Sequence, residues 1–193
     1  TAVEDLPKPA IRPYPTQYVG DHRLTDGTEV TIRPIRPEDE PLVVAFHGKL
    51  SERSVRSRYF QSLQLDQRTA HERMVRVCFN DYDREWALLV EHRGPAGAEL
   101  LAIGRLSRIP GQARAEFGLL VIDEWQHRGL GTELLRRLIT IGQSEGLEAI
   151  TASILRDNLD MQKLCKKLGF ELRMVPDDAV FEAILLLDHG VRA

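Results

Sequence analysis

The chain has 193 residues and a net charge of −3, with 42% of its residues hydrophobic and 28% charged. This length is enough for one domain with a full hydrophobic core. The slightly acidic net charge argues against nucleic acid as the main partner. No apolar run approaches the roughly 20 residues of a membrane-spanning helix. The two cysteines, Cys78 and Cys165, lack metal-ligand spacing, so we expect no metal site, no disulfide framework and a cytoplasmic location.

Residues 1–25 are rich in proline and have few periodic apolar positions. Such a segment favours an extended, polyproline-like conformation. We therefore expect a linker over residues 1–25 and a single domain over residues 26–188. Because the first residue is threonine and not methionine, we expect the linker to join the domain to a preceding part of a longer chain.

From residue 26 onward the hydrophobic pattern becomes regular. Glu29–Pro34 alternates as a strand does, and a helix is expected after Pro37, with apolar residues at helical spacing. Ser51 is a suitable N-cap for a second helix that runs to about Leu63. The remaining predicted elements are a helix over 70–78, strands over 86–91, 100–109 and 114–122, a helix over 131–142, a strand over 149–154, a helix over 159–168, and strands over 170–175 and 180–187. This order predicts an α/β (α+β) fold whose mixed sheet of about seven strands has helices on both faces.

The stretch Leu119–Thr132 (LLVIDEWQHRGLGT) runs from the fourth predicted strand through a short loop into a helix. Gly129 and Gly131 stand where this helix begins, so backbone N–H groups can converge there and the helix N-terminus adds positive potential. These features predict an anion site suited to a pyrophosphate, to which Arg128 would add charge-assisted hydrogen bonds. Taken alone, a G-x-G is more often a plain turn. The dinucleotide fingerprint and the P-loop are excluded because their further residues are missing.

The loop resembles the Q/R-x-x-G-x-G/A signature of the GNAT acetyltransferases, matched by Gln126, Gly129 and Gly131. Downstream, residues 158–170 (NLDMQKLCKKLGF) look like the family's N-x-x-x-x-x-L-Y-x-x-x-G-F helix, with Cys165 where the family often carries tyrosine. The two motifs stand in the family's order, and the resemblance covers roughly residues 28–188. It implies the GNAT fold, with a mixed and mostly antiparallel sheet, and acetyl-CoA as the co-substrate.

The same resemblance assigns roles to individual residues. It implies that the Leu119 N–H polarises the thioester carbonyl, while Val121 and Asn158 contact the pantetheine arm. The other cofactor-binding residues that it implies surround the pyrophosphate: Gln126, His127, Arg128, Gly129, Leu130, Gly131 and Thr132. An ordinary helix N-cap is an equally good interpretation of Asn158. Cys165 is more simply a buried core residue than the acid that protonates the departing thiolate, a role that water could take.

Amide formation from a thioester requires a neutral amine, and a lysine with a pKa near 10.4 is neutral in only about 1 part in 2,500 at pH 7. A base near the thioester would remove this obstacle. Glu116 is the candidate because Ala115-Glu116-Phe117 resembles the A-E-F of protein-lysine acetyltransferases, in which the glutamate is the general base. The plain alternative is a solvent-facing position on the strand.

Two further segments narrow the subfamily. Residues 51–60 (SERSVRSRYF) and 80–88 (NDYDREWAL) look like segments of the bacterial Pat-type protein acetyltransferases. Enzymes of this type acetylate a lysine of acyl-CoA synthetases and often carry an inactive synthetase-like region upstream. The resemblance therefore implies a protein lysine as the acceptor, an acyl-CoA synthetase as the partner and an N-terminal fusion.

Three function classes stay open at this point. The first is the protein-lysine acetyltransferase, the second a small-amine acetyltransferase on the same fold, and the third a non-catalytic acyl-CoA-binding sensor. Arg53, Arg56 and Arg58 are more simply a solvated helix face than contacts for an acidic partner near the acceptor channel.

Overall fold

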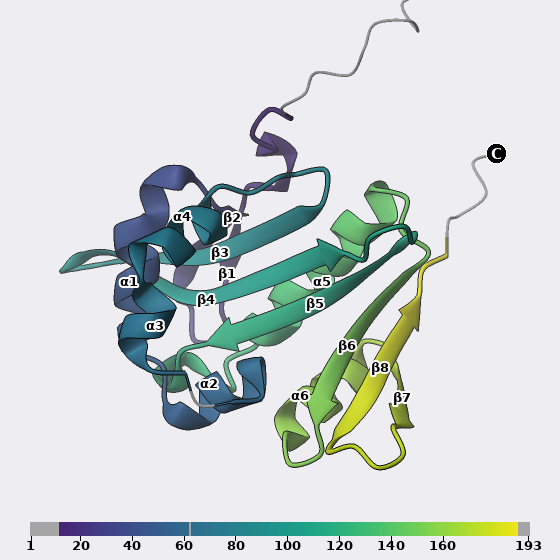
Figure 1. Ribbon diagram of the computed structural model, residues 1–193. Helices are drawn as coiled ribbons and strands as arrows, with labels where there is room; N and C mark the ends of the chain where they lie inside the picture. The colour runs from purple at the N-terminus through teal and green to yellow at the C-terminus, as the bar shows by residue number, and fades with distance from the viewer. Residues whose placement is uncertain (1–11, 62, 189–193) are drawn as a thin grey trace, which may run out of the picture.

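The computed structural model describes residues 12–61 and 63–188, and these form an open mixed sheet with helices around it (Figure 1). The sheet order is β1-β2-β3-β4-β5-β6-β8-β7. Neighbouring strands are antiparallel except β5 and β6, which are parallel. The strands are β1 (Gly20–Arg23), β2 (Glu29–Pro34), β3 (Glu85–Gly94), β4 (Gly97–Arg108), β5 (Arg114–Val121), β6 (Ala149–Leu155), β7 (Glu171–Met174) and β8 (Val180–Leu186). The predicted α/β fold is confirmed.

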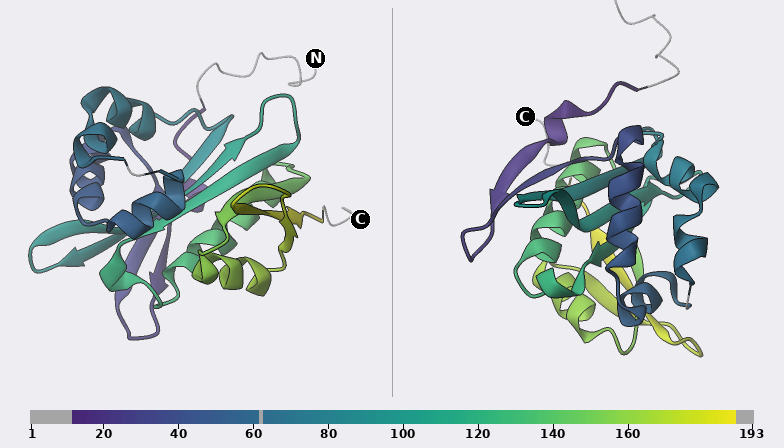
Figure 2. Two further views of the ribbon diagram at one scale, coloured as in Figure 1. Left: turned by 60° about the horizontal axis from the view of Figure 1, so that its bottom comes forward. Right: turned by 90° about the vertical axis from the view of Figure 1, so that its left-hand side faces the viewer.

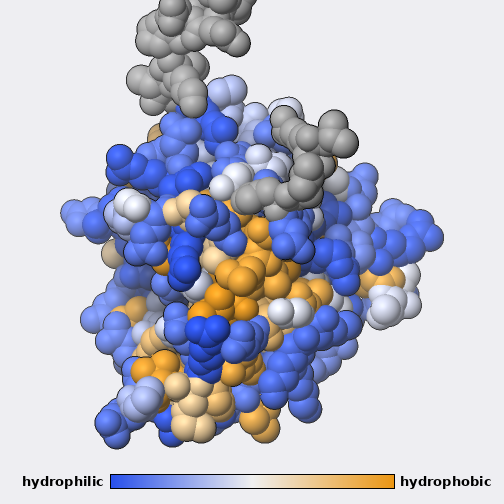
Figure 3. Space-filling model, turned by 90° about the vertical axis from the view of Figure 1, so that its right-hand side faces the viewer, coloured by the Kyte–Doolittle hydropathy of each residue, from blue (hydrophilic) through white to orange (hydrophobic). Residues whose placement is uncertain are grey.

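Helices cover both faces of this sheet. They are α1 (Glu40–Gly48), α2 (Glu52–Tyr59), α3 (Leu65–Thr69), α4 (His71–Cys78), α5 (Leu130–Ser144) and α6 (Leu159–Lys167). Helices α1 to α4 lie on one side and α5 on the other, as the view from the left shows (Figure 2). On the side where β7 and β8 lie, the surface shows an apolar area bordered by hydrophilic residues (Figure 3).

Helix α5 is anchored by its apolar stripe. Four residues share one face at helical spacing and are at most 1% exposed: Leu134, Leu135, Leu138 and Ile141. Burying a leucine or isoleucine side chain contributes roughly 1.5–3 kcal/mol, so this stripe fixes α5 against the sheet. Gly104 of β4 allows the close approach, because a Cβ there would lie 2.8 Å from Leu134 Cγ.

The sheet begins earlier than the predicted domain boundary at residue 26. Gly20–Arg23 pair with β2 as an edge strand, and their sequence, GDHR, has no apolar alternation that could have revealed a strand. Part of the predicted linker also contacts the domain, since the Tyr14 hydroxyl donates to the Pro34 carbonyl at 2.7 Å. Residues 1–11, which hold the first prolines, lie outside the described residues.

Two helix predictions need correction. Helix α2 ends at Tyr59 and not near Leu63, because Phe60 adopts a left-handed conformation (φ 60°) that stops the helix. The five-residue helix α3 was not predicted, since it is too short to show a periodic pattern. No helix in the described part of the chain is long and apolar enough to span a membrane.

Candidate active site

Strands β5 and β6 separate halfway along β5. Their parallel pairing runs only from Arg114 opposite Ala149 to Glu116 opposite Thr151, and beyond this point the two strands diverge (Figure 1). Strand β5 stays paired with β4 as far as Val121. One edge of β5 therefore has no strand partner beyond Glu116.

The N–H groups of Leu119 and Val121 point toward this open edge. The Ile122 N–H donates to the Leu101 carbonyl on the β4 side at 3.0 Å. Because successive N–H groups along a strand point to opposite edges, those of Leu119 and Val121 point away from β4. The Val121 carbonyl, on the same open side, accepts a hydrogen bond from the Gln126 side-chain amide at 3.0 Å. This is the geometry that the predicted backbone contacts to a thioester and its pantetheine arm require.

A cavity of about 360 Å³ runs along the open edge, with walls from β5, α2, α6 and the start of α5. Eight of the ten residues predicted to bind the cofactor line it: Leu119, Val121, Gln126, His127, Gly129, Gly131, Thr132 and Asn158. We call this space the cofactor cavity.

The N-terminus of α5 forms one end of the cofactor cavity. Gly129 precedes the helix with a φ of 86°, a conformation that glycine adopts without steric cost. The first bond of the helix runs from the Glu133 N–H to the Gly129 carbonyl at 3.0 Å, so the N–H groups of residues 130–132 precede the helical ladder. Their position and the helix dipole suit an anion such as a pyrophosphate.

The other two predicted residues do not line the cavity. Leu130 is 1% exposed and packs into the core, so it can offer only its N–H. The Arg128 guanidinium donates to Asp26 at 3.1 Å and lies 4.6 Å from the centre of the Trp125 ring. Its remaining N–H donors can still bind a phosphate, but the side chain does not reach into the cavity in this structure.

Positive charge reaches the cavity from side chains that the sequence analysis did not assign to the cofactor. Lys163 and Lys167 of α6 and Arg53 of α2 line it. The two lysines are four residues apart on one face of α6, within the motif over residues 158–170. This spacing is the signal that could have identified them as phosphate ligands.

Helix α2 is fixed across the cofactor cavity from two sides. Asp123, in the loop after β5, accepts hydrogen bonds from the Ser51 N–H at 3.3 Å and the Ser54 hydroxyl at 3.1 Å. On the other side, Arg56 pairs with Asp157, just before α6, at 2.8 Å. The Arg56 side chain is 55% exposed, so it lies on a solvated helix face as the sequence favoured, and it also contacts the segment before α6.

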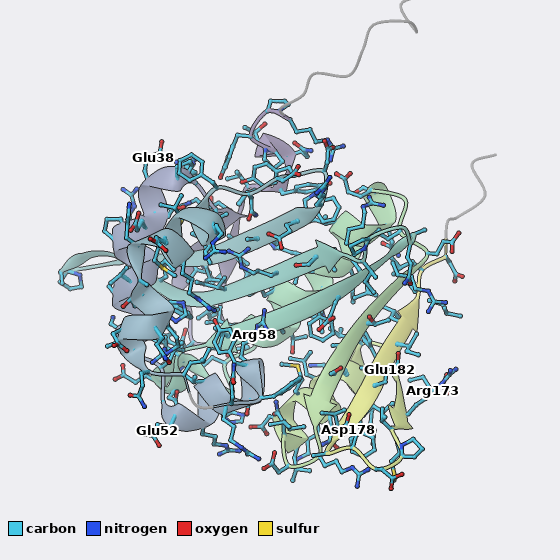
Figure 4. The ribbon with its side chains drawn as sticks, in the orientation of Figure 1. Glu38, Glu52, Arg58, Arg173, Asp178 and Glu182 are labelled. Atoms are coloured by element: carbon cyan, nitrogen blue, oxygen red, sulfur yellow. The ribbon has the colours of Figure 1, made fainter. Side chains whose placement is uncertain are left out.

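A second cavity of about 270 Å³ adjoins the first and holds Glu116. The Glu116 side chain is exposed, and no described residue forms a hydrogen bond with it. Arg58 reaches from α2 over Gly118 of β5, where a Cβ would overlap its guanidinium (Figure 4). Because this space contains the predicted base, we call it the acceptor cavity.

The motif of α6 has two residues whose roles the structure clarifies. Asn158 caps the helix, since its side chain accepts the Met161 N–H at 3.2 Å, and it also lines both cavities. Cys165 is fully buried, and burial raises the pKa of its thiol to about 12. The thiol lies in the core and lines neither cavity, which excludes it as an acid for the leaving group. Within residues 12–61 and 63–188, no three His, Cys, Asp or Glu side chains form a cluster that could hold a metal ion.

A family model described as an acetyltransferase (GNAT) domain matches residues 29–171. The chain belongs to the GNAT acetyltransferase family. An acetyltransferase of Pseudomonas aeruginosa is 26% identical over 163 residues, which cover 83% of this chain and 86% of that protein. The acetyltransferase Pat of Mycolicibacterium smegmatis is 28% identical over 160 residues, covering 82% of this chain but only 44% of that longer protein. The crystal structure of the GNAT domain of S. lividans PAT superimposes with a TM-score of 0.80 at 26% identity, covering 91% of this chain and all of that domain.

Replacing Gly131 by valine is expected to weaken coenzyme A binding by about tenfold or more, the value of one charge-assisted hydrogen bond. A Cβ at Gly131 would lie 3.1 Å from Leu164 Cδ1, so the larger side chain must project into the cofactor cavity. Calorimetry with coenzyme A measures the effect. Gly48→Val is the control, because a Cβ there has no neighbour within 4 Å. Equal affinities of the two variants would place the pyrophosphate elsewhere.

Proposed function

We propose that this GNAT acetyltransferase transfers the acetyl group of acetyl-CoA to a lysine side chain of another protein. The observation that supports it most is the position of Glu116. Its carboxylate lies in a cavity that joins the cofactor cavity at Leu119, whose N–H points to the open edge of β5. The candidate base and the candidate oxyanion donor therefore belong to adjoining parts of one cleft.

Glu116 is proposed as the general base, directly or through a water molecule. It accepts a proton from the lysine ammonium, so that the neutral amine attacks the thioester carbonyl carbon. The Leu119 N–H then stabilises the oxyanion that forms. The splayed edge of β5 and the N-terminus of α5 hold the co-substrate for this attack.

A protein acceptor is favoured because the acceptor cavity has exposed walls. Phe60 at its border is 45% exposed, and Glu116 and Ser153 are exposed as well. A lysine on a protein surface can therefore enter without a deep channel. We propose an acyl-CoA synthetase as the acceptor protein, a cytoplasmic location and a synthetase-like region fused upstream, on the resemblance of residues 51–60 and 80–88 to segments of the Pat-type enzymes.

A small amine is the second candidate acceptor. In the acceptor cavity Glu116 is the one carboxylate among the lining residues. An enzyme for polyamines would be expected to present several acids to a substrate with several positive charges.

A non-catalytic sensor is the third candidate, and it would bind acetyl-CoA without turnover.

Incubation with radiolabelled acetyl-CoA and cell extract separates these functions. Transfer of label to protein bands, and its location on lysine by mass spectrometry, is the expected result. Label found only in small molecules would favour the second candidate. Binding of the co-substrate without any transfer would favour the sensor.

A further inference from the structure

The cofactor and acceptor cavities meet at four residues. Ser57, Leu119, Asn158 and Met161 line both spaces. The pyrophosphate end lies at α5 on one side of this junction, and Glu116 lies on the other. A thioester that reaches from one cavity into the other therefore places its sulfur near these four residues.

A departing thiolate needs a hydrogen-bond donor at that place. Cys165 is buried in the core and cannot reach the sulfur. Tyr59 lines only the acceptor cavity, and its ring contacts the guanidinium groups of Arg58 and Arg73 at 5.2 and 5.3 Å. Among the four shared residues, two have side chains that can donate: Ser57 and Asn158.

Of these two, Ser57 has the free hydroxyl. The Asn158 side-chain oxygen accepts the Met161 N–H, and this capping bond holds the side chain, with its remaining amide donor, at the first turn of α6. In α2, the Ser54 hydroxyl contacts Ser51, Asp123 and Gln126. The Ser57 hydroxyl has no hydrogen-bond partner in the described part of the chain. A helical serine usually faces solvent or bonds its own backbone, but Ser57 is half-buried and lines both cavities.

The anchoring of α2 keeps Ser57 at the junction. The Ser54–Asp123 contact holds the helix on the loop after β5, and Val55, which is 3% exposed, anchors α2 to the body of the domain. Ser57 follows closely in the sequence, so both anchors restrict its position. A donor held in advance stabilises charge more effectively than a mobile one.

We propose that the Ser57 hydroxyl donates a hydrogen bond to the coenzyme A sulfur as the carbon–sulfur bond breaks. This inference rests on the proposed function. Glu116 takes the first proton of the lysine ammonium, and the neutral nitrogen then forms the new C–N bond and releases its second proton to water. As the C–S bond breaks, its electron pair goes to sulfur, which accepts the Ser57 hydrogen bond and takes a proton from water. Ser57 keeps its own proton, because a hydroxyl is a weaker acid than a thiol.

The test compares Ser57→Ala and Ser57→Thr with the parent enzyme, using poly-L-lysine as the acceptor. A hydrogen bond to a charged group implies that Ser57→Ala lowers kcat by roughly 10- to 100-fold, with little change in the KM for acetyl-CoA. Ser57→Thr restores the hydroxyl and is expected to recover most of the loss. Acetyl-seleno-CoA provides the decisive readout, because a selenolate leaves with less assistance and should narrow the gap between Ser57→Ala and the parent.

The possible outcomes separate the two levels of the proposal. If the parent is active and Ser57→Ala has the same kcat, the role of Ser57 is overturned and the proposed function stays intact. The same conclusion follows if Ser57→Ala loses kcat by the same factor with acetyl-CoA and with acetyl-seleno-CoA. A parent that binds acetyl-CoA but acetylates no lysine overturns the proposed function, and the role of Ser57 with it.

Discussion

Replacement of Glu116 by glutamine should lower acetyl transfer at pH 7 by roughly 10²- to 10⁴-fold, the usual contribution of a general base. The amide keeps the size of the side chain but cannot accept the proton of a lysine ammonium. Coenzyme A affinity should stay unchanged, because Glu116 lines only the acceptor cavity. Steady-state kinetics and calorimetry measure the two quantities separately.

The pH dependence of this variant gives a sharper test. Without a base, the rate depends on the neutral fraction of the acceptor lysine, which increases roughly 100-fold between pH 7 and 9. The deficit of Glu116→Gln should therefore shrink as the pH rises. Glu182→Gln is the matched control, since Glu182 lies on β8 and lines neither cavity (Figure 4). Equal turnover of Glu116→Gln and the parent from pH 6 to 9 would remove Glu116 from the mechanism.

The elements with strong local patterns could be predicted from the sequence. Strand β2 has the predicted bounds, Glu29–Pro34, and the stripe of α5 packs as its helical spacing predicts. In both elements apolar residues recur at a regular spacing, and this spacing can be read from a single sequence. Strand β1 lacks such a pattern and is held by pairing with β2, so its sequence alone could not reveal it.

The candidate site was predictable where a motif is local and unpredictable where it depends on distant residues. Gly129 and Gly131 form the turn and helix start that their spacing suggested. Arg128, in contrast, pairs with Asp26, which is 102 residues away in the sequence, and no local pattern encodes that contact. The same holds for Ser57, whose position depends on the contact of Ser54 with Asp123, 69 residues away in the sequence.

Replacement of Asp39 by alanine should reduce the free energy of unfolding by about 2–5 kcal/mol, because the buried Arg33 guanidinium loses two hydrogen bonds and keeps Glu91 as its ionic partner. Asp39 accepts two hydrogen bonds from the Arg33 guanidinium, at 2.8 and 2.7 Å, and a third from the Arg36 N–H at 2.7 Å. The Arg33 and Asp39 side chains are 9% and 6% exposed. Urea denaturation followed by circular dichroism measures the change.

Two comparisons show whether burial causes this loss. Glu171→Ala removes a carboxylate from an exposed pair with Arg173, and no measurable change is expected because solvent screens such pairs. The double variant Arg33→Met, Asp39→Ala should be more stable than Asp39→Ala alone, since it leaves no guanidinium with unsatisfied N–H groups in the core. Glu91, the other partner of Arg33, still has Arg93 at 3.2 Å. A double variant no more stable than the single one would mean that the lost backbone contact of Asp39, and not the buried charge, determines the stability of this part of the fold.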